Sequence, residues 1–192
     1  MTASLHLAET LERSGALLDG HFLLSSGRHS DRFVQKFRIL ERPTLLEPLA
    51  RALADHFAGA APTVVVSAAV GGIVLGYETA RQLGTFGIFV EKDAGVPTLR
   101  RGFVLAPDDR ALVVEDVVTT GGSVREVMDV VRAHGASVAG VGAIVRRAHV
   151  DFGVPTSALL DLPIESFDPG RCPQCAAGEP ITEPGSRFLH SA

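Results

Sequence analysis

Lysine is scarce in this chain of 192 residues, because 16 of its 18 basic residues are arginine and only Lys36 and Lys92 are lysine. A function that needs a lysine ammonium therefore depends on one of these two positions. The formal net charge is −4, so a nucleic-acid surface would have to be local. We expect no nucleic-acid partner.

The sequence also lacks a long hydrophobic run. Its longest apolar stretch, residues 64–77, is shorter than the roughly 20 residues that cross a bilayer, and Gly71 and Gly72 interrupt it. Polar and charged residues precede any apolar run at the N-terminus, unlike in a secretory signal peptide. These features predict a cytoplasmic, globular protein with no membrane partner.

Cysteine occurs only twice, as Cys172 and Cys175 in the sequence Cys-Pro-Gln-Cys. Such a pair supplies half of a zinc site, and no second pair is present. His149, Asp151 or His190 would complete a site only if the fold brought them close. The surrounding Pro- and Gly-rich segment differs from the strand–helix–strand setting of a thioredoxin-type redox pair. Free thiols in a loop are the simplest interpretation, with a metal site or a redox pair as the alternative.

The most informative stretch is residues 112–123, Leu-Val-Val-Glu-Asp-Val-Val-Thr-Thr-Gly-Gly-Ser. It predicts a buried strand with two carboxylates, Glu115 and Asp116, then a loop of small residues and a helix from Val124. Loop amides and a helix N-terminus bind phosphate, while carboxylates accept hydrogen bonds from sugar hydroxyls or hold a cation. Neither a Walker A loop nor the dinucleotide fingerprint matches. The stretch therefore predicts a phosphate–sugar site.

This stretch resembles the motif with which type I phosphoribosyltransferases bind 5-phosphoribosyl 1-pyrophosphate (PRPP). An ordinary strand–turn–helix would explain the two glycines but not the paired acids followed by paired threonines. The resemblance implies that Mg²⁺ is bound mainly through PRPP, with no dedicated protein ligands. It also implies a set of PRPP-binding residues at Glu115, Asp116, Val117, Val118, Thr119, Thr120, Gly121, Gly122 and Ser123.

A second turn of small residues lies between a predicted strand at 62–66 and a predicted helix at 73–84. Small residues at such a turn let a ligand approach the backbone closely. The resemblance implies that this turn faces the pyrophosphate of PRPP through Val70, Gly71 and Gly72. The alternative is a turn kept small for packing.

Residues 20–34 predict a hairpin, because apolar strand-like pieces flank a polar turn. The pattern Phe-x-Leu-x-Ser-Gly-x-x-Ser-Asp within it is similar to the hood segment of orotate phosphoribosyltransferases. In that family an arginine at the end of a core strand, here predicted at 138–145, pairs with the orotate carboxylate; without the resemblance, a surface arginine is the alternative. The orotate-binding residues that the resemblance implies are Ser26, Gly27, Phe33, Thr119 and Arg147.

Residues 91–101 form a polar loop between strands predicted at 86–90 and 102–105. In the resembled family this segment closes over the active site, commonly that of the partner subunit, and its basic residues neutralise the pyrophosphate. The family's Lys-x-x-Lys-x-His-Gly pattern is missing. Lys92 matches by position, and Arg100 and Arg101 are candidates for the missing charges. A solvated arginine pair is the alternative.

Alternating strands and helices predict an α/β fold with a central parallel sheet flanked by helices. Further predicted elements are helices at 5–18, 43–58 and 124–134 and a strand at 157–164. We expect a single domain over residues 1–192. Its small N-terminal hood covers about residues 1–40 together with the C-terminal segment, and its core covers about residues 41–165.

The resemblance implies a homodimeric orotate phosphoribosyltransferase with a reduced catalytic loop. Its substrates would be PRPP and orotate, and its products orotidine 5′-monophosphate and pyrophosphate. Lys92, Glu115 and Asp116 would be the catalytic residues; no residue is an obvious general base. Two alternatives remain open, a purine phosphoribosyltransferase and a regulator that senses PRPP without catalysis.

Overall fold

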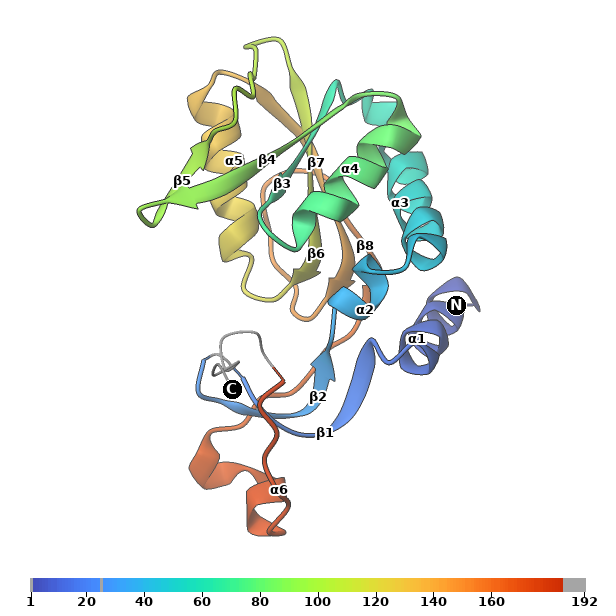
Figure 1. Ribbon diagram of the computed structural model, residues 1–192, viewed down its shortest axis with the longest axis vertical. Coiled ribbons are helices and arrows are strands. Elements are labelled where there is room, and N and C mark those ends of the chain that lie inside the picture. The colour runs from blue at the N-terminus through green and yellow to red at the C-terminus, as the bar shows by residue number, and fades with distance from the viewer. Residues whose placement is uncertain (1, 25, 185–192) are drawn as a thin grey trace. The chain divides into compact units, whose positions relative to one another are not determined.

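The computed structural model describes residues 2–24 and 26–184. Internal contacts divide the chain into two units, drawn in Figure 1. The larger unit spans Ile39–Leu162, and the smaller one combines Met1–Arg38 with Pro163–Ala192. None of the helices in the described part of the chain is long and apolar enough to cross a membrane.

A six-stranded sheet with the order β5-β4-β3-β6-β7-β8 forms the centre of the larger unit. Five strands run parallel, and only β5 (Val96–Leu99) is antiparallel to its neighbour. The parallel strands are β3 (Val64–Ala68), β4 (Phe86–Asp93), β6 (Arg110–Val118), β7 (Ser137–Arg146) and β8 (Thr156–Asp161). The α/β prediction with a central, mainly parallel sheet is confirmed.

Helices cover both faces of this sheet (Figure 1). On one face, α5 (Gly122–Ala133) buries Val127 and Met128 in a cluster with Val113 of β6. On the other face lie α3 (Pro43–Phe57) and α4 (Gly72–Leu83). The 3-10 turn η1 (Ala58–Ala60) follows α3. A Cβ at Gly140 of β7 would lie 2.5 Å from the ring of Phe57, so close packing of α3 explains a glycine in this strand.

The smaller unit consists of an N-terminal part and a C-terminal part that pair with each other. Helix α1 (Thr2–Arg13) precedes the antiparallel strands β1 (Leu17–Leu23) and β2 (His29–Val34), which confirms the predicted hairpin. Isolated bridges join Phe22 to Thr182 and His29 to Phe167. The C-terminal part also holds the short helices η2 (Pro169–Arg171) and α6 (Pro173–Ala176). Helix α2 (Phe37–Leu40) lies at the boundary between the units.

Two predicted elements differ from the structure. The helix expected over 5–18 ends at Arg13, because Gly15 has φ +72° and the chain continues into β1 from Leu17. No strand forms at 102–105, where Gly102 has φ +73° and Val104 is 79% exposed. Instead the polar segment 91–101, expected as a loop, continues β4 and turns back as β5.

The turn between β4 and β5 explains that difference. Ala94 and Gly95 have φ values of +49° and +86°. Positive φ at both central residues matches the two-residue turns whose twist fits a β-hairpin. The segment expected as an irregular lid is therefore a short hairpin at the edge of the sheet.

Candidate functional site

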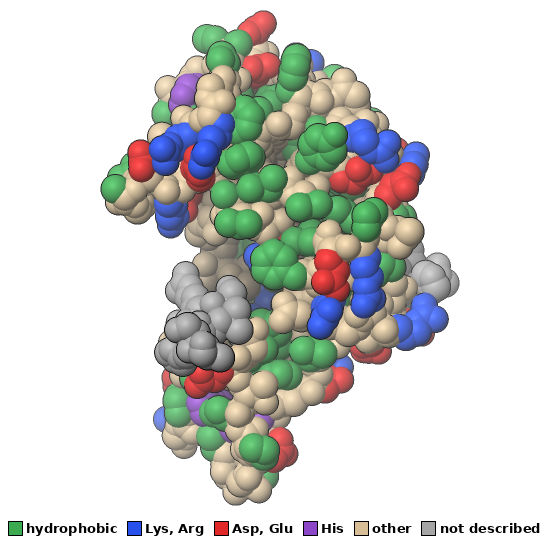
Figure 2. Space-filling model, in the orientation of Figure 1, with side chains coloured by type: hydrophobic (Ala, Val, Ile, Leu, Met, Phe, Trp, Pro, Cys, Tyr) green, Lys and Arg blue, Asp and Glu red, His purple; other side chains and the backbone are tan. Residues whose placement is uncertain are grey.

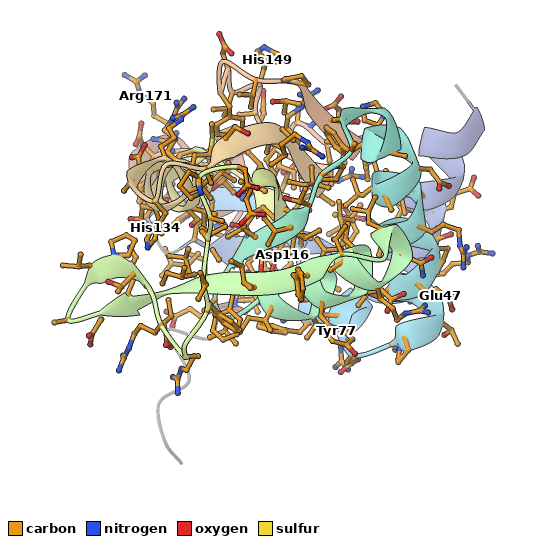
Figure 3. The ribbon with its side chains drawn as sticks, turned by 90° about the horizontal axis from the view of Figure 1, so that it is seen from above. Glu47, Tyr77, Asp116, His134, His149 and Arg171 are labelled. Atoms are coloured by element: carbon orange, nitrogen blue, oxygen red, sulfur yellow. The ribbon has the colours of Figure 1, made fainter. Side chains whose placement is uncertain are left out.

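The two small-residue turns singled out in the sequence lie at the same edge of the sheet. Strands β3 and β6 are neighbours, but the chain leaves β3 toward β4 and leaves β6 toward β7, on opposite sides. Ligands of open α/β sheets bind at such a switch point, beyond the carboxyl ends of the strands. Asp116 lies near the carboxyl end of β6, and Figure 3 labels it in the sheet together with Tyr77 of α4.

The loop after β6 surrounds a small pocket of about 50 Å³ that is lined by Glu115 and residues 117–124. Thr119, Thr120 and Ser123 are exposed there, and α5 begins at Gly122 within the same loop. Among the described residues no side chain caps this helix. Its first amides, which have no partner within the helix, therefore face a polar pocket suited to a phosphate.

The position of Gly121, the N-cap of α5, accepts only glycine. Its φ is +79°, and a Cβ there would lie 2.9 Å from both Phe152 and Val150. Phe152 is buried, and the Arg125 guanidinium lies 5.2 Å from its ring centroid. Phe152 and Val150 thus hold in place the loop at residues 119–123, which we call the phosphate loop. Sequence reasoning missed them, because no local motif marks residues that become neighbours of the loop only through the fold.

The carboxylates of Glu115 and Asp116 are held in place by the backbone. Glu115 is 8% exposed and Asp116 is 2% exposed. The Asp116 amide donates to Glu115 Oε1 at 3.1 Å, and the Val117 amide donates to Asp116 Oδ1 at 2.7 Å. Both acids are therefore oriented at the carboxyl end of β6, where Glu115 also lines the small pocket.

A larger pocket of about 350 Å³ brings together Val70, Lys92 and Ser123 from three distant parts of the chain. Lys92 Nζ donates to Glu126 Oε1 of α5 at 2.8 Å, and Glu126 lines the same pocket. No local sequence pattern indicated this acidic partner. Gly71 and Gly72 are buried at the start of α4. A Cβ at Gly72 would lie 3.1 Å from Ser67 Cβ, so this position serves the packing of α4 on β3.

Arg100 and Arg101 form ion pairs on the hairpin. Arg101 Nε and Nη2 donate to the Glu91 carboxylate at 2.8 and 3.0 Å. This hydrogen-bonded pair lowers the pKa of Glu91 and raises that of Arg101. Arg100 Nη1 lies 3.3 Å from Asp93 Oδ1. Of the cationic candidates on this segment, only Lys92 lines the larger pocket in the described part of the chain.

Arg147 follows β7, and its amide donates to the carbonyl of Val118 at 2.8 Å, directly beside Thr119. Its Nε is buried and has no hydrogen-bond partner among the described residues. Burial lowers the pKa of this guanidinium. The neighbouring Arg146 differs, because its Nη2 donates to Asp161 at 2.9 Å. Arg147 is thus a half-buried cation without a carboxylate partner within residues 2–24 and 26–184.

The remaining predicted orotate-binding residues belong to the smaller unit. Ser26 and Gly27 lie in the turn between β1 and β2, where Gly27 has φ +77° and its amide donates to Leu24 O at 2.8 Å. Phe33 lies on β2 with its ring centroid 5.8 Å from that of Phe22.

Comparison with known proteins identifies the family. A model of the phosphoribosyl transferase domain matches residues 38–151. The orotate phosphoribosyltransferase of Pelotomaculum thermopropionicum is 52% identical over 180 residues, which cover 93% of this chain and 95% of the relative. That of Caldanaerobacter subterraneus is 47% identical over 183 residues, covering 94% and 96%. The chain belongs to the orotate phosphoribosyltransferase family.

Solved structures of orotate phosphoribosyltransferases have a similar fold. The crystal structure of the Aeropyrum pernix protein has a TM-score of 0.69 and 27% identity, covering 81% of this chain and 93% of its own. That of Mycobacterium tuberculosis H37Rv has a TM-score of 0.70 and 26% identity, covering 83% and 97%. The expected type I phosphoribosyltransferase fold is confirmed, and so is the family that the motif at 112–123 and the hood pattern indicated.

Proposed function

We propose that this enzyme transfers the phosphoribosyl group of PRPP to orotate, giving orotidine 5′-monophosphate and pyrophosphate in pyrimidine biosynthesis. One observation carries the proposal. A phosphate-type loop at the switch point of the sheet lies beside Arg147, a half-buried cation without a carboxylate partner among the described residues. Together they offer a phosphate site and a site for an anionic base.

The loop at 119–123 holds the 5′-phosphate. Exposed hydroxyls of Thr119, Thr120 and Ser123 and the first amides of α5 surround the small pocket. The N-terminus of a helix carries a partial positive charge, which favours the anion. Gly121, fixed against Phe152, keeps this loop in one conformation and so positions the ribose.

The pyrophosphate occupies the larger pocket. Lys92 and the turn at 68–70 line it, next to Ser123 of the phosphate loop. Negative charge grows on the leaving group as the bond to the anomeric carbon breaks, so a nearby ammonium lowers the barrier. Lys92 exchanges its contact with Glu126 for one with the pyrophosphate.

Glu115 and Asp116 accept hydrogen bonds from the ribose hydroxyls. Backbone amides already orient both carboxylates, so little reorganisation is needed when the sugar binds. Oxygen donors beside a phosphate pocket also fit Mg²⁺, which is usually bound through one or two carboxylates and substrate phosphates. When bound, Mg²⁺ would neutralise charge on the pyrophosphate.

Arg147 binds the orotate carboxylate, with Thr119 beside it. A guanidinium and a carboxylate form a planar, bidentate pair. Adenine and hypoxanthine carry no carboxylate and would leave this buried cation unpaired, which strongly disfavours them. The pairing of Arg147 with a carboxylate therefore favours orotate over a purine.

We also propose a homodimer. Tyr77 on α4 and Phe86 at the start of β4 are 68% and 80% exposed, and Val70, which precedes α4, is 74% exposed. Figure 2 shows exposed apolar side chains over this region. Large apolar side chains exposed near one another are typical of a contact surface. Sedimentation analysis should give a dimer that Tyr77→Glu weakens; a monomer at micromolar concentration would refute the proposal.

A turnover assay tests the proposed reaction. The enzyme is supplied with Mg²⁺ and PRPP and offered orotate, uracil, adenine or hypoxanthine in parallel, with pyrophosphate release as the readout. We expect release with orotate only, and its loss in Asp116→Asn. Calorimetric PRPP binding without turnover of any base would instead support a PRPP-sensing regulator.

A further inference from the structure

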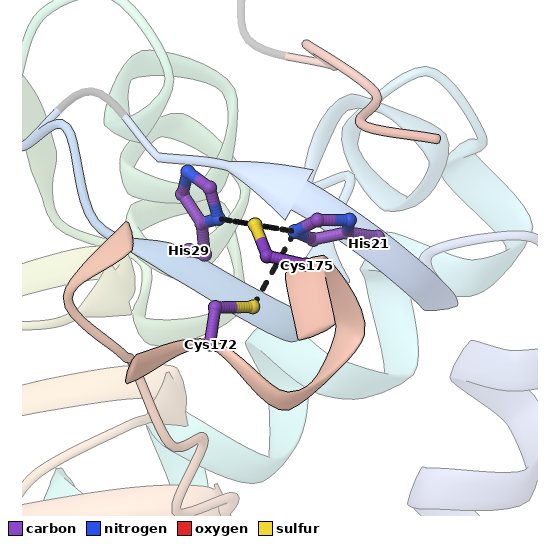
Figure 4. Close-up of side chains that lie close together, drawn as sticks. All are labelled: His21, His29, Cys172 and Cys175. Atoms are coloured by element: carbon purple, nitrogen blue, oxygen red, sulfur yellow. Dashed lines mark hydrogen bonds between the residues drawn. The ribbon is translucent and has the colours of Figure 1, made fainter. Parts of the chain in front are cut away.

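Four side chains of the types that bind metals lie close together within the smaller unit. His21 of β1, His29 of β2, and Cys172 and Cys175 at the start of α6 point toward one another (Figure 4). Their ligand atoms all lie within 4.8 Å of each other. Both thiols are free, as the simplest interpretation of the sequence held, but they lie at a short helix, Cys172 is buried and both face histidines.

Four of the six separations between the ligand atoms are close to the edges of a zinc tetrahedron. His21 Nε2 lies 3.0 Å from His29 Nδ1 and 3.4 Å from Cys172 Sγ. Cys175 Sγ lies 3.6 Å from His21 Nε2 and 3.2 Å from His29 Nδ1. Zinc bonds of about 2.0–2.1 Å to nitrogen and about 2.3 Å to sulfur place tetrahedral ligands roughly 3.3–3.8 Å apart. Small adjustments would let one ion contact all four atoms.

The surroundings fix the ligands before any metal binds. His21 Nδ1 lies 2.9 Å from the carbonyl of Glu179, so a proton on Nδ1 leaves the Nε2 lone pair facing the thiols. Gln174, between the two cysteines, donates to the carbonyl of Gly20 at 2.8 Å and holds α6 against β1. Such outer contacts accompany imidazole ligands of metals.

We propose that His21, His29, Cys172 and Cys175 bind one structural Zn²⁺ ion. Two thiolates and two imidazoles are a donor set that selects zinc. Four protein ligands fill the tetrahedron and leave no position for substrate, so the ion has a structural role. The half-site that the sequence offered is completed by the N-terminal hairpin.

The four-residue cluster found among the described residues includes none of the other candidates raised from the sequence. His149 and Asp151 belong to the larger unit, and His190 lies outside the described residues.

The ion would join two segments that are about 150 positions apart in the chain, for example His21 and Cys172. The described part of the smaller unit has few large buried apolar side chains, among them Leu11, Leu17 and Phe22. Small units with limited cores often depend on a metal or disulfide for stability. Zinc binding, which releases the thiol protons, would therefore hold the C-terminal segment on the hairpin.

The test uses the full chain, purified under reducing conditions without a histidine tag. Elemental analysis by mass spectrometry should find about one zinc per chain. Cys175→Ser and His29→Ala should lose most of it after dialysis against a chelator, while the control His149→Ala retains it. Because loss of a ligand can also impair folding, Co²⁺ is also added to metal-stripped wild-type protein. We expect the visible absorption of tetrahedral cobalt with thiolate-to-metal charge transfer, and a higher unfolding temperature with zinc than without.

Two results would overturn the proposal. One is a folded wild-type protein that holds no zinc after incubation with the metal and gives no tetrahedral cobalt spectrum. The other is a Cys172–Cys175 disulfide in protein purified without reductant, detected as a mass loss of two hydrogens, together with an unfolding temperature that zinc does not change.

Discussion

Replacing Arg147 with methionine should separate substrate recognition from stability. In the free enzyme the buried Nε of this arginine has no hydrogen-bond partner among the described residues, and burial lowers the pKa of the guanidinium. Both facts mean that the charged guanidinium lowers the stability of the folded protein until an anion pairs with it. Methionine fills much of the same space without needing a partner. Arg147→Met should therefore leave the ligand-free protein as stable as the wild type, or slightly more stable.

Catalysis should suffer in the same variant. Removing one partner of a desolvated, hydrogen-bonded charge pair costs about 2–5 kcal/mol. Because Arg147 is only half-buried, we expect the lower part of that range, about 2–3 kcal/mol. This free energy corresponds to a decrease in kcat/KM for orotate of about 30- to 150-fold. The KM for PRPP should change little.

Steady-state kinetics with each substrate varied, together with urea unfolding, check both expectations. Arg146→Met is the matched control, because its guanidinium is paired with Asp161 rather than free for a ligand. The control should lose at most about 1 kcal/mol of stability, as exposed ion pairs do, and keep its KM for orotate. An Arg147→Met enzyme whose kcat/KM for orotate stays within threefold of the wild type would refute the role of Arg147.

Three further changes are expected to have distinct effects. Gly121→Ala should raise the KM for PRPP at least about tenfold and destabilise the protein by about 1–3 kcal/mol. The reason is that it combines φ +79° with a clash against Phe152. The control Gly84→Ala has φ +68° but open space around it, so it should lose stability without the defect in KM. Lys92→Gln should weaken pyrophosphate binding in calorimetry, whereas Glu126→Gln, which removes the competing partner of the ammonium, should strengthen it; equal losses in both would contradict the exchange. The Arg146 hydrogen bond lowers the pKa of Asp161, so this pair stabilises the protein at neutral pH and stops doing so as the pH falls through that lowered pKa. Asp161→Asn should thus cost up to about 1 kcal/mol at pH 7 and progressively less as the pH falls below about 4, as urea titrations across this range will show.

The phosphate loop could be predicted because its signal is local. A buried strand, two acids, a glycine-rich turn and a helix follow one another within residues 112–123, and each is encoded by its own residues. The same holds for the N-terminal hairpin at 20–34. Local patterns of this kind survive folding because the backbone conformations they favour agree with the tertiary contacts.

The hairpin formed by β4 and β5 was not predicted, and the reason is physical. Its polar composition is that of a loop, and Gly95-Val96-Pro97 argues against regular structure. Residues 96–99 nevertheless form a strand, because β4 supplies them with backbone partners along the open edge of the sheet. That pairing also places Arg100 beside Asp93 and Arg101 beside Glu91, so both arginines form ion pairs within the hairpin.

The sequence alone determined the alternation of strands and helices outside residues 91–105, the acids and small residues of the phosphate loop, and the family. Only the tertiary structure decided which distant side chains meet: Glu126 with Lys92, Phe152 with Gly121, and His21 with Cys172. A local pattern records what each segment needs from its own backbone, whereas a pocket or a metal site depends on where the sheet and the hairpin bring segments that are separated in sequence. For this reason the two cysteines looked like half a site until the structure placed two histidines beside them.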